Sequence, residues 1–247
     1  KGDSTSIRFK GVNDWGQFGN HLRYQKKTTH RYHHHHPIFT LQLSTHTSFF
    51  LSSSIYVSGR NQHGILGLGH SHFTTSFQPI PFPIPIIFFS VKERNVIAMD
   101  IQSNIYTWGF MSVFDEDSSV YYSSNIPVLL TYDFEHTPQY VVAGHDCFIV
   151  LDSKHRIFTW GHKFNSFIVP ISIHRPIFDI AAGSSGAIAL SFHGSLFFWD
   201  SITSPPILIS LSFIPVIPSY IRQYDHYIFI SRGRSTRNLH VLDLNDI

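Results

Sequence analysis

The stretch IYVSGRNQHGILGLGH, residues 55–70, decides the fold of this chain. It opens with Ile55, Tyr56 and Val57, and β-branched and aromatic residues of this kind favour a pleated strand. Turn-forming residues follow at once at Gly59, Asn61, Gly64, Gly67 and Gly69. Gly and Asn tolerate positive φ and a close approach of backbone, which most residues do not. The stretch therefore predicts a strand, a tight turn and closely packed glycines.

Fragments of this pattern recur along the chain. The residue that ends each strand serves as a marker, and the markers are Gly11, Gly59, Gly109, Gly161, Asp200 and Asp243. They are separated by 48, 50, 52, 39 and 43 residues, close to the roughly 40–50 residues of one four-stranded propeller blade. The sequence thus predicts an all-β fold, a β-propeller of four-stranded blades with five repeat intervals, as a single domain over residues 1–247.

A second motif lies before the markers and keeps the same period. It consists of an apolar strand, a small polar elbow and another apolar strand. Aligned on the elbow, one slot holds His46, Asn95, Cys147, Gly186 and His226. No stretch shows a capped apolar period of 3.6 residues, so little helix is expected.

Composition narrows the class of protein. Charged residues make up 14% of the 247 residues, and the net charge of +2 does not by itself imply nucleic acid or an anionic membrane. Cys147 is the one cysteine, which excludes an intrachain disulfide and favours an intracellular location without distinguishing nucleus, cytoplasm or organelle. The longest apolar stretch, 80–91, is interrupted by three prolines and is too short to span a bilayer.

The repeats resemble those of the regulator-of-chromosome-condensation family, named for the chromatin-bound exchange factor of the Ran GTPase. Besides 55–70, the resemblance is carried by GVNDWGQFG (11–19) and by the Trp-Gly pairs at 108–109 and 160–161. It implies a propeller, usually of seven blades, although this chain shows only five intervals. The family pattern implies structural roles for Gly11, Gly16, Gly59, Asn61, Gly64, Gly67, Trp108, Gly109, Trp160 and Gly161.

The same resemblance points to one face of the propeller as a partner surface, because the family's exchange factor contacts its GTPase through acidic and His side chains at the elbows. The matching residues here are His46, His145, Asp146, Asp225 and His226. The alternative is that the His residues hold neighbouring backbone within each blade.

The segment 20–37 is basic, rich in His and without apolar periodicity, so it is predicted to be a long loop or insertion. Its cationic residues are Arg23, Lys26, Lys27 and Arg31, which can contact the phosphates of RNA or DNA or simply face solvent. The run His33–His36 lacks the converging spacing of a zinc site, so no metal and no cofactor are expected.

No catalytic constellation is expected. Cys147 lies two residues from His145, but it fills a repeat slot and leads into an apolar strand, which favours a buried thiol. The apolar connectors 80–91 and 205–218 would leave exposed patches on a free monomer. The sequence therefore favours a non-enzymatic interaction scaffold within a larger multi-protein or ribonucleoprotein assembly. The alternatives are an exchange factor for a Ran-type small GTPase and a module for attachment to chromatin or RNA.

Overall fold

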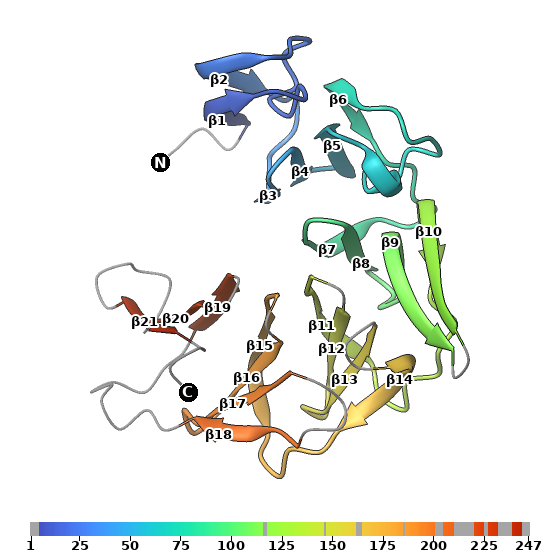
Figure 1. The fold of residues 1–247 in the computed structure, drawn as a ribbon, viewed down its shortest axis with the longest axis vertical. Coiled ribbons are helices and arrows are strands. Elements are labelled where there is room, and N and C mark those ends of the chain that lie inside the picture. The colour runs from blue at the N-terminus through green and yellow to red at the C-terminus, as the bar shows by residue number, and fades with distance from the viewer. Residues whose placement is uncertain are drawn as a thin grey trace. The chain divides into compact units, whose positions relative to one another are not determined.

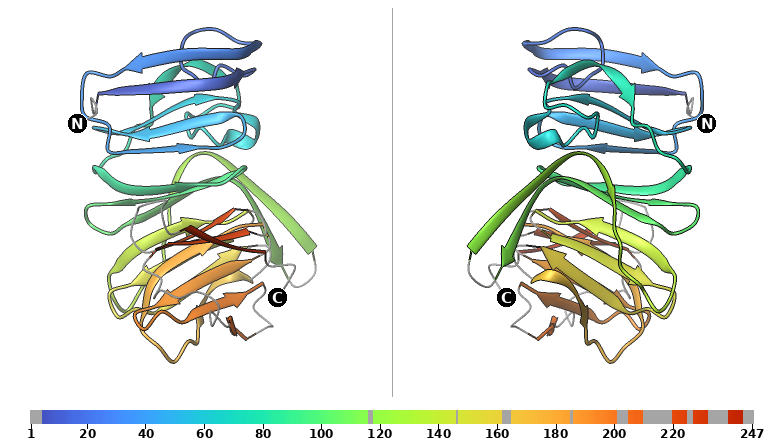
Figure 2. Two further views of the ribbon diagram at one scale, coloured as in Figure 1. Left: turned by 90° about the vertical axis from the view of Figure 1, so that its left-hand side faces the viewer. Right: turned by 90° about the vertical axis from the view of Figure 1, so that its right-hand side faces the viewer.

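The computed structural model describes residues 5–115, 118–145, 147–161, 165–184, 186–200, 205–209, 220–224, 227–231 and 239–243. The chain forms two compact units (Figure 1). The first unit comprises Lys1–Met111 and Tyr122–Leu130, and the second comprises Ser112–Tyr121 and Thr131–Ile247. Each unit is built from small sheets whose strand order follows the chain, and every described pairing register is antiparallel (Figure 2).

The first unit begins with a two-stranded sheet of β1 (Ser6–Asn13) and β2 (Gln25–His33). A four-stranded sheet follows, formed by β3 (Thr40–Leu43), β4 (Thr47–Leu51), β5 (Ile55–Gly59) and β6 (Thr74–Pro79). The next sheet contains β7 (Ile86–Val91), β8 (Asn95–Asp100), β9 (Ile105–Asp115) and β10 (Ser118–Leu129). The strands β9 and β10 contribute residues to both units.

The second unit repeats this meander. Its first sheet contains β11 (Pro138–Ala143), β12 (Cys147–Asp152), β13 (Ile157–Gly161) and β14 (Asn165–Ile171). Its second sheet contains β15 (Ile177–Ala182), β16 (Ala187–Ser191), β17 (Leu196–Trp199) and β18 (Ile207–Ile209). The last sheet has three described strands, β19 (Tyr220–Tyr224), β20 (Tyr227–Ser231) and β21 (Leu239–Asp243).

Helix is scarce, as the sequence predicts. Among the described residues the single helical element is the short 3₁₀ turn η1 (Gln62–Gly64). No helix in the described part of the chain is long and apolar enough to cross a membrane.

The elbows share one backbone geometry. Across each elbow an N–H donates to the carbonyl three residues later, in the pairs Ser44–Thr47, Lys92–Asn95, Gly144–Cys147 and Gly183–Gly186, at 2.8–3.0 Å. The slot is therefore filled by Thr47, and placing His46 there was one residue out of register. The alignment by residue type favoured His, whereas the backbone hydrogen bonds define the register of the elbow. His46 lies at the tip of the turn, in the position that Arg94 holds in the next sheet.

The glycine loop that decided the fold occurs twice with the same hydrogen bonds. Asn61 Oδ1 accepts from Leu66 N at 2.8 Å, and Asn61 Nδ2 donates to His70 O at 2.6 Å. Asn13 makes the equivalent pair with Phe18 N and Leu22 O, at 3.0 and 3.1 Å. In both loops the asparagine side chain thus ties backbone five and nine residues ahead.

Each glycine loop lies against the next sheet. A Cβ built on Gly64 would meet Asn125 of β10 at 2.5 Å, and one on Gly67 would meet Trp108 Nε1 at 2.8 Å. Both glycines also adopt positive φ, +73° and +67°. The glycines are therefore needed both for the turn and for the close approach of a neighbouring strand.

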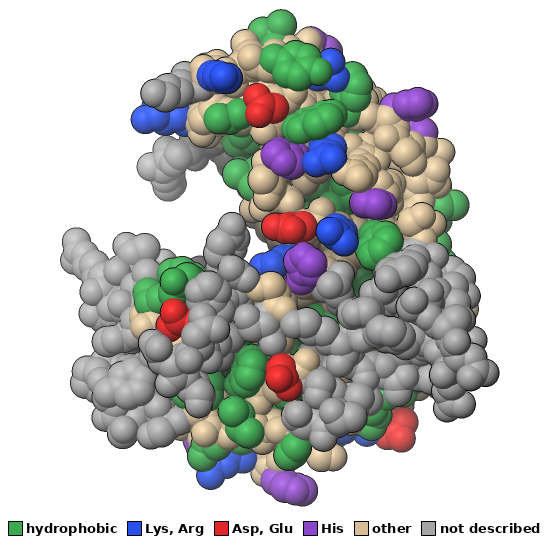
Figure 3. All heavy atoms as spheres, viewed as in Figure 1, with side chains coloured by type: hydrophobic (Ala, Val, Ile, Leu, Met, Phe, Trp, Pro, Cys, Tyr) green, Lys and Arg blue, Asp and Glu red, His purple; other side chains and the backbone are tan. Residues whose placement is uncertain are grey.

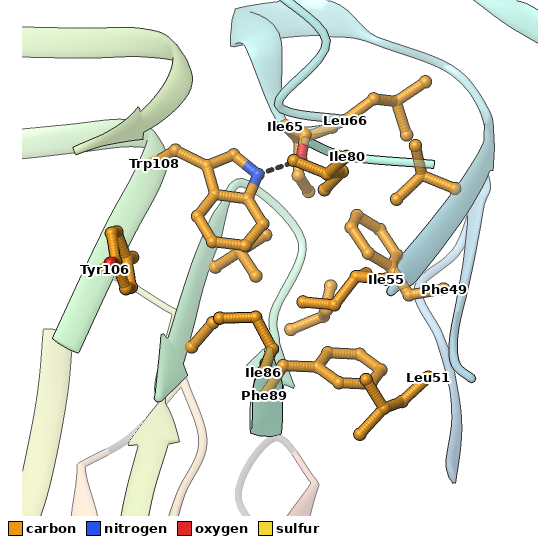
Figure 4. Close-up of a cluster of buried hydrophobic side chains, with 14 residues drawn as sticks. Phe49, Leu51, Ile55, Ile65, Leu66, Ile80, Ile86, Phe89, Tyr106 and Trp108 are labelled. Atoms are coloured by element: carbon orange, nitrogen blue, oxygen red, sulfur yellow. Dashed lines mark hydrogen bonds between the residues drawn. The ribbon is translucent and has the colours of Figure 1, made fainter. Parts of the chain in front are cut away.

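The core of the first unit lies between its two four-stranded sheets (Figure 4). Trp108 of β9 is fully buried, and its Nε1 donates to Ile65 O of the glycine loop at 2.8 Å. Phe49 and Phe89 pack from the opposing sheets, with ring centroids 6.2 Å apart. In the second unit Trp199 is buried in the equivalent manner against side chains of β11 and β12.

The loop prediction for 20–37 is wrong over Gln25–His33, which forms β2 and pairs with β1. The strand carries almost no apolar period because two of its half-buried positions hold the polar residues Thr28 and His30. Tyr32 packs on Phe50 and Phe77, with centroids 5.7 and 4.6 Å away, while Arg31 lies opposite Arg8 on the outer face and is exposed. Backbone pairing to β1, rather than side-chain burial, holds this strand.

Candidate functional site

Several charged side chains of the first unit surround a hollow between two elbows. This hollow, here called the elbow pocket, has a volume of about 360 Å³. Its charged and titratable lining consists of His46, Arg60, His63, Glu93 and Arg94. Arg, His and acidic side chains alternate over this unit in the view of Figure 3.

Backbone geometry places these side chains together. Arg60 N donates to His46 O at 3.0 Å, and Phe110 N donates to Arg94 O at 2.7 Å. The residue after each marker glycine is thus bonded to the tip of the elbow beside it. Because the two sheets pack side by side, the two elbow tips and η1 line one hollow.

The elbow pocket is electropositive. Burial lowers the pKa of His63, and the charges of Arg94 and Arg60 lower it further, so both guanidinium groups act on this imidazole. Within the described residues no ion pair joins either arginine to a carboxylate. The lining holds two arginines against one carboxylate, that of Glu93, and an excess of guanidinium groups suits an anionic ligand group.

Aromatic rings extend the elbow pocket in two directions. Arg60 Cζ lies 4.9 Å from the ring centroid of Trp15, which is itself 6.4 Å from the ring of His46. On the other side Arg94 Cζ lies 5.6 Å from the ring centroid of Phe110. Cations over aromatic faces are held by the ring quadrupole, so these arginines are positioned rather than freely mobile.

Charge is unevenly distributed along the chain. No Asp or Glu occurs between Trp15 and Lys92. The first unit carries ten Lys and Arg against four Asp and Glu, whereas the second carries eight against twelve. The net charge of +2 therefore conceals a basic unit and an acidic one, which the overall composition could not reveal.

The elbow residues predicted as a partner surface have different outcomes. His46 lines the elbow pocket. His145 is half-buried at an elbow of the second unit, where its N–H donates to Gly183 O at 3.2 Å. Asp146, Asp225 and His226 lie outside the described residues. Partner binding by these residues stays a prediction.

The four predicted nucleic-acid contacts lie on β2 and in the turn before it. Arg31 is on the outer face of the sheet of β1 and β2, and Lys26 and Lys27 belong to β2. Arg23 precedes β2 and stacks on aromatic rings, with Cζ 4.0 Å from the ring centroid of Phe73. Nucleic-acid binding by this group likewise stays a prediction.

Sequence reasoning missed Arg60, His63 and Arg94. The signal was available in the repeat itself, since Arg94 occupies the elbow tip that His46 occupies one sheet earlier. The single cysteine was interpreted correctly as a buried thiol, because Cys147 is 2% exposed and packs in the core of the second unit. The described residues contain no cluster of three His, Cys, Asp or Glu able to hold a metal.

The sheets are successive antiparallel meanders, and glycine loops within two sheets of the first unit pack on the next sheet; this is the fold of an RCC1-like β-propeller. The sequence matches no protein-family model, and no curated protein is detectably similar to it. The fold, however, is similar to that of human WBSCR16, with a TM-score of 0.75 at 18% identity over 90% of this chain. The resemblance seen in the repeats is therefore confirmed at the level of the fold.

Two structures of yeast RCC1 (Prp20) support the same assignment. One, bound to Kap60, gives a TM-score of 0.73 at 13% identity and covers 92% of this chain. The other, Prp20p of Saccharomyces cerevisiae, described together with its binding to Gsp1p and histones, gives 0.71 at 14% identity and covers 94% of this chain. The chain spans 64–66% of the length of these proteins.

Proposed function

We propose that this chain is a non-catalytic interaction scaffold that docks a negatively charged partner macromolecule through the elbow pocket of its first unit. The RCC1-like fold supports a role in protein interaction or one like that of an exchange factor. The scaffold role, rather than chemistry, is favoured by the site itself. A propeller offers a broad, rigid surface, and its function depends on the residues displayed there.

One observation carries the proposal. Arg60 and Arg94 flank an open hollow, and no ion pair within the described residues neutralises them. A shallow hollow suits groups projecting from a large partner better than an enclosed small substrate. Interface arginines of this kind make bidentate bonds to carboxylate or phosphate and are frequent hot spots.

The proposal is tested by charge reversal. The double variant Arg60→Glu with Arg94→Glu should leave the large assembly and sediment as a free chain in native extracts. Arg175→Glu is the matched control, because Arg175 is exposed in the second unit, outside the elbow pocket. Thermal unfolding checks that both variants fold. Co-sedimentation of the double variant with the wild-type assembly would contradict docking through the elbow pocket.

A second candidate is guanine-nucleotide exchange on a Ran-type GTPase. Its support is the fold alone, because the structure of Prp20p is described with its binding to Gsp1p. Release of labelled GDP from the GTPase separates the two roles. A scaffold leaves the release rate unchanged, whereas acceleration at catalytic amounts of the chain would replace the scaffold with an exchange factor.

A further inference from the structure

The elbow pocket continues into a row of aromatic rings and arginines in contact, here called the cation–aromatic ladder. Its members in spatial order are Tyr24, Arg23, Phe73, Trp15 and Arg60. Arg23 Cζ lies 4.6 Å from the centroid of Tyr24 and 4.0 Å from that of Phe73. Phe73 and Trp15 meet edge to face with centroids 6.4 Å apart, and Arg60 lies 4.9 Å from Trp15. All five residues belong to the first unit.

The rings of the ladder are displayed rather than buried. Tyr24 is 70% exposed and Phe73 is 43% exposed. Tyr24 also adopts a φ of +57°, a rare conformation for a bulky residue, and its hydroxyl accepts a hydrogen bond from Arg23 Nη2 at 2.9 Å. The ladder thus holds a large aromatic side chain at the surface at a conformational cost.

We infer that the cation–aromatic ladder and the elbow pocket bind a single-stranded nucleic acid, with bases stacked on Tyr24 and Phe73 and phosphates at Arg23, Arg60 and Arg94. This inference rests on the proposed function and names its partner. Proteins that bind single strands combine a positive groove with aromatic platforms, because every base has a π-face and every nucleotide a phosphate. Both ingredients occur here in one continuous path.

Charge and shape favour this partner over an acidic protein segment. The acid-free stretch from Trp15 to Lys92 contains the whole ladder together with His46, Arg60 and His63. An acidic peptide would engage the arginines but leave the exposed rings of Tyr24 and Phe73 without a function. A duplex keeps its bases stacked inside, so it cannot use these rings either.

The test is fluorescence anisotropy with labelled 20-nucleotide poly(U) RNA, oligo(dT) and a duplex of equal length, using the full chain at several salt concentrations. The wild type should bind both single strands more tightly than the duplex, with affinity falling as salt rises. Tighter binding of RNA than of DNA would show that the surface recognises the 2′-hydroxyl. Equal binding would show that affinity comes from base stacking and phosphate contacts. Either result supports the inference.

Three variants identify the surface. Tyr24→Ala with Phe73→Ala should lower affinity at least tenfold while the salt dependence stays as in the wild type, because only rings are lost. Arg23→Ala with Arg60→Ala should lower both the affinity and the salt dependence. The control Arg8→Ala with Lys10→Ala removes two charges from the outer face of β1 and should stay within twofold of the wild type.

The conservative variants Tyr24→Phe and Phe73→Tyr keep the aromatic rings. They should bind like the wild type, because the surface stays folded and the rings remain available for stacking. Absence of binding to both oligonucleotides at low salt would overturn the inference, as would unchanged binding by the ring variant. Displacement of the RNA by poly-glutamate at an equal charge concentration would also overturn it and assign an acidic protein partner. None of these outcomes by itself contradicts docking through the elbow pocket. That proposal fails only if the double variant Arg60→Glu with Arg94→Glu stays in the assembly.

Discussion

The indole nitrogen of Trp108 donates a hydrogen bond of 2.8 Å to the carbonyl of Ile65, and both groups are buried. Trp108 belongs to β9, whereas Ile65 belongs to the glycine loop that follows β5. One side chain therefore ties the loop of one sheet to the next sheet. At this junction the Trp that ends one strand is therefore paired with the glycine turn of the preceding repeat.

The first prediction concerns this bond. Trp108→Phe should reduce the free energy of unfolding by about 1–3 kcal/mol, because the buried Ile65 carbonyl loses its donor. The measurement is urea denaturation of the full chain. Trp199→Phe is the matched control: Trp199 is equally buried, but its Nε1 has no hydrogen-bond partner among the described residues. Equal losses for both variants would show that ring volume, not the hydrogen bond, matters at Trp108.

Asn61 should be essential to the glycine loop. Asn61→Ala removes the bonds to Leu66 N and His70 O and leaves the buried Leu66 N–H without its partner, so it should cost about 2 kcal/mol of unfolding free energy. The neighbouring Gln62→Ala, at an exposed position, should cost less than about 0.5 kcal/mol. Similar losses at both positions in thermal denaturation would contradict the role given to Asn61.

Two glycines of the same loop should differ sharply. Gly67→Ala places a methyl group 2.8 Å from Trp108 Nε1 and also strains a positive φ, so we expect at least about 2 kcal/mol of destabilisation. Gly69→Ala shares the positive φ but has its nearest neighbour, Ile126 Cγ2, at 3.7 Å. That variant should be destabilised only by the strain of a side chain at positive φ, about 1 kcal/mol. Denaturation of the pair separates crowding from backbone strain, and equal costs would exclude crowding against Trp108.

His34 should make stability depend on pH. Its ring packs on Phe50 and Tyr56, with centroids 5.1 and 4.5 Å away, and burial, aided by His36 and His35, lowers its pKa below the usual value. The unfolded chain then binds more protons than the folded chain between the folded pKa and about 6.5. The free energy of unfolding should therefore fall as the pH drops through this window.

The comparison is with His34→Phe, which keeps an aromatic ring at the position but does not titrate. Its unfolding free energy should decline less between pH 7.5 and pH 5.5 than that of the wild type, as measured by denaturant titration at each pH. Parallel curves for the two proteins would remove His34 as a source of the pH dependence.

The sequence predicted the fold because backbone demands recur at a fixed period. Gly59 is required by its positive φ, and Asn61 by its side-chain bonds to backbone. Because both requirements are local, these residue types can be recognised in one repeat alone. The prediction failed at β2, where exposed residues alternate with half-buried ones that are mostly polar, so no apolar pattern marks the strand. The prediction also failed at the elbow. His46 was aligned with the slot by residue type, whereas the hydrogen bonds show that Thr47 occupies the slot.

The candidate site was only partly predictable for a related reason. His46 and Arg23 were found as elbow and basic residues, but Arg60 and Arg94 come from different sheets, and only packing brings them to one hollow. The ladder joins Tyr24 to Phe73 through Arg23, across 49 residues of chain. Contacts of this kind follow from the fold and leave no local periodic trace.

The glycine loops have a consequence for aggregation. Gly69 N donates to Asn125 O of β10 at 2.7 Å, and Asn20 forms a bridge with Ser76 of β6. Each loop thus occupies hydrogen-bonding groups on the outer edge of the following sheet, where an unpaired strand would recruit another chain. Loss of a loop therefore also opens the edge strand of the neighbouring sheet, which becomes a template for misassembly. In these two repeats, each sheet edge is thus protected against self-association by the loop of the preceding sheet.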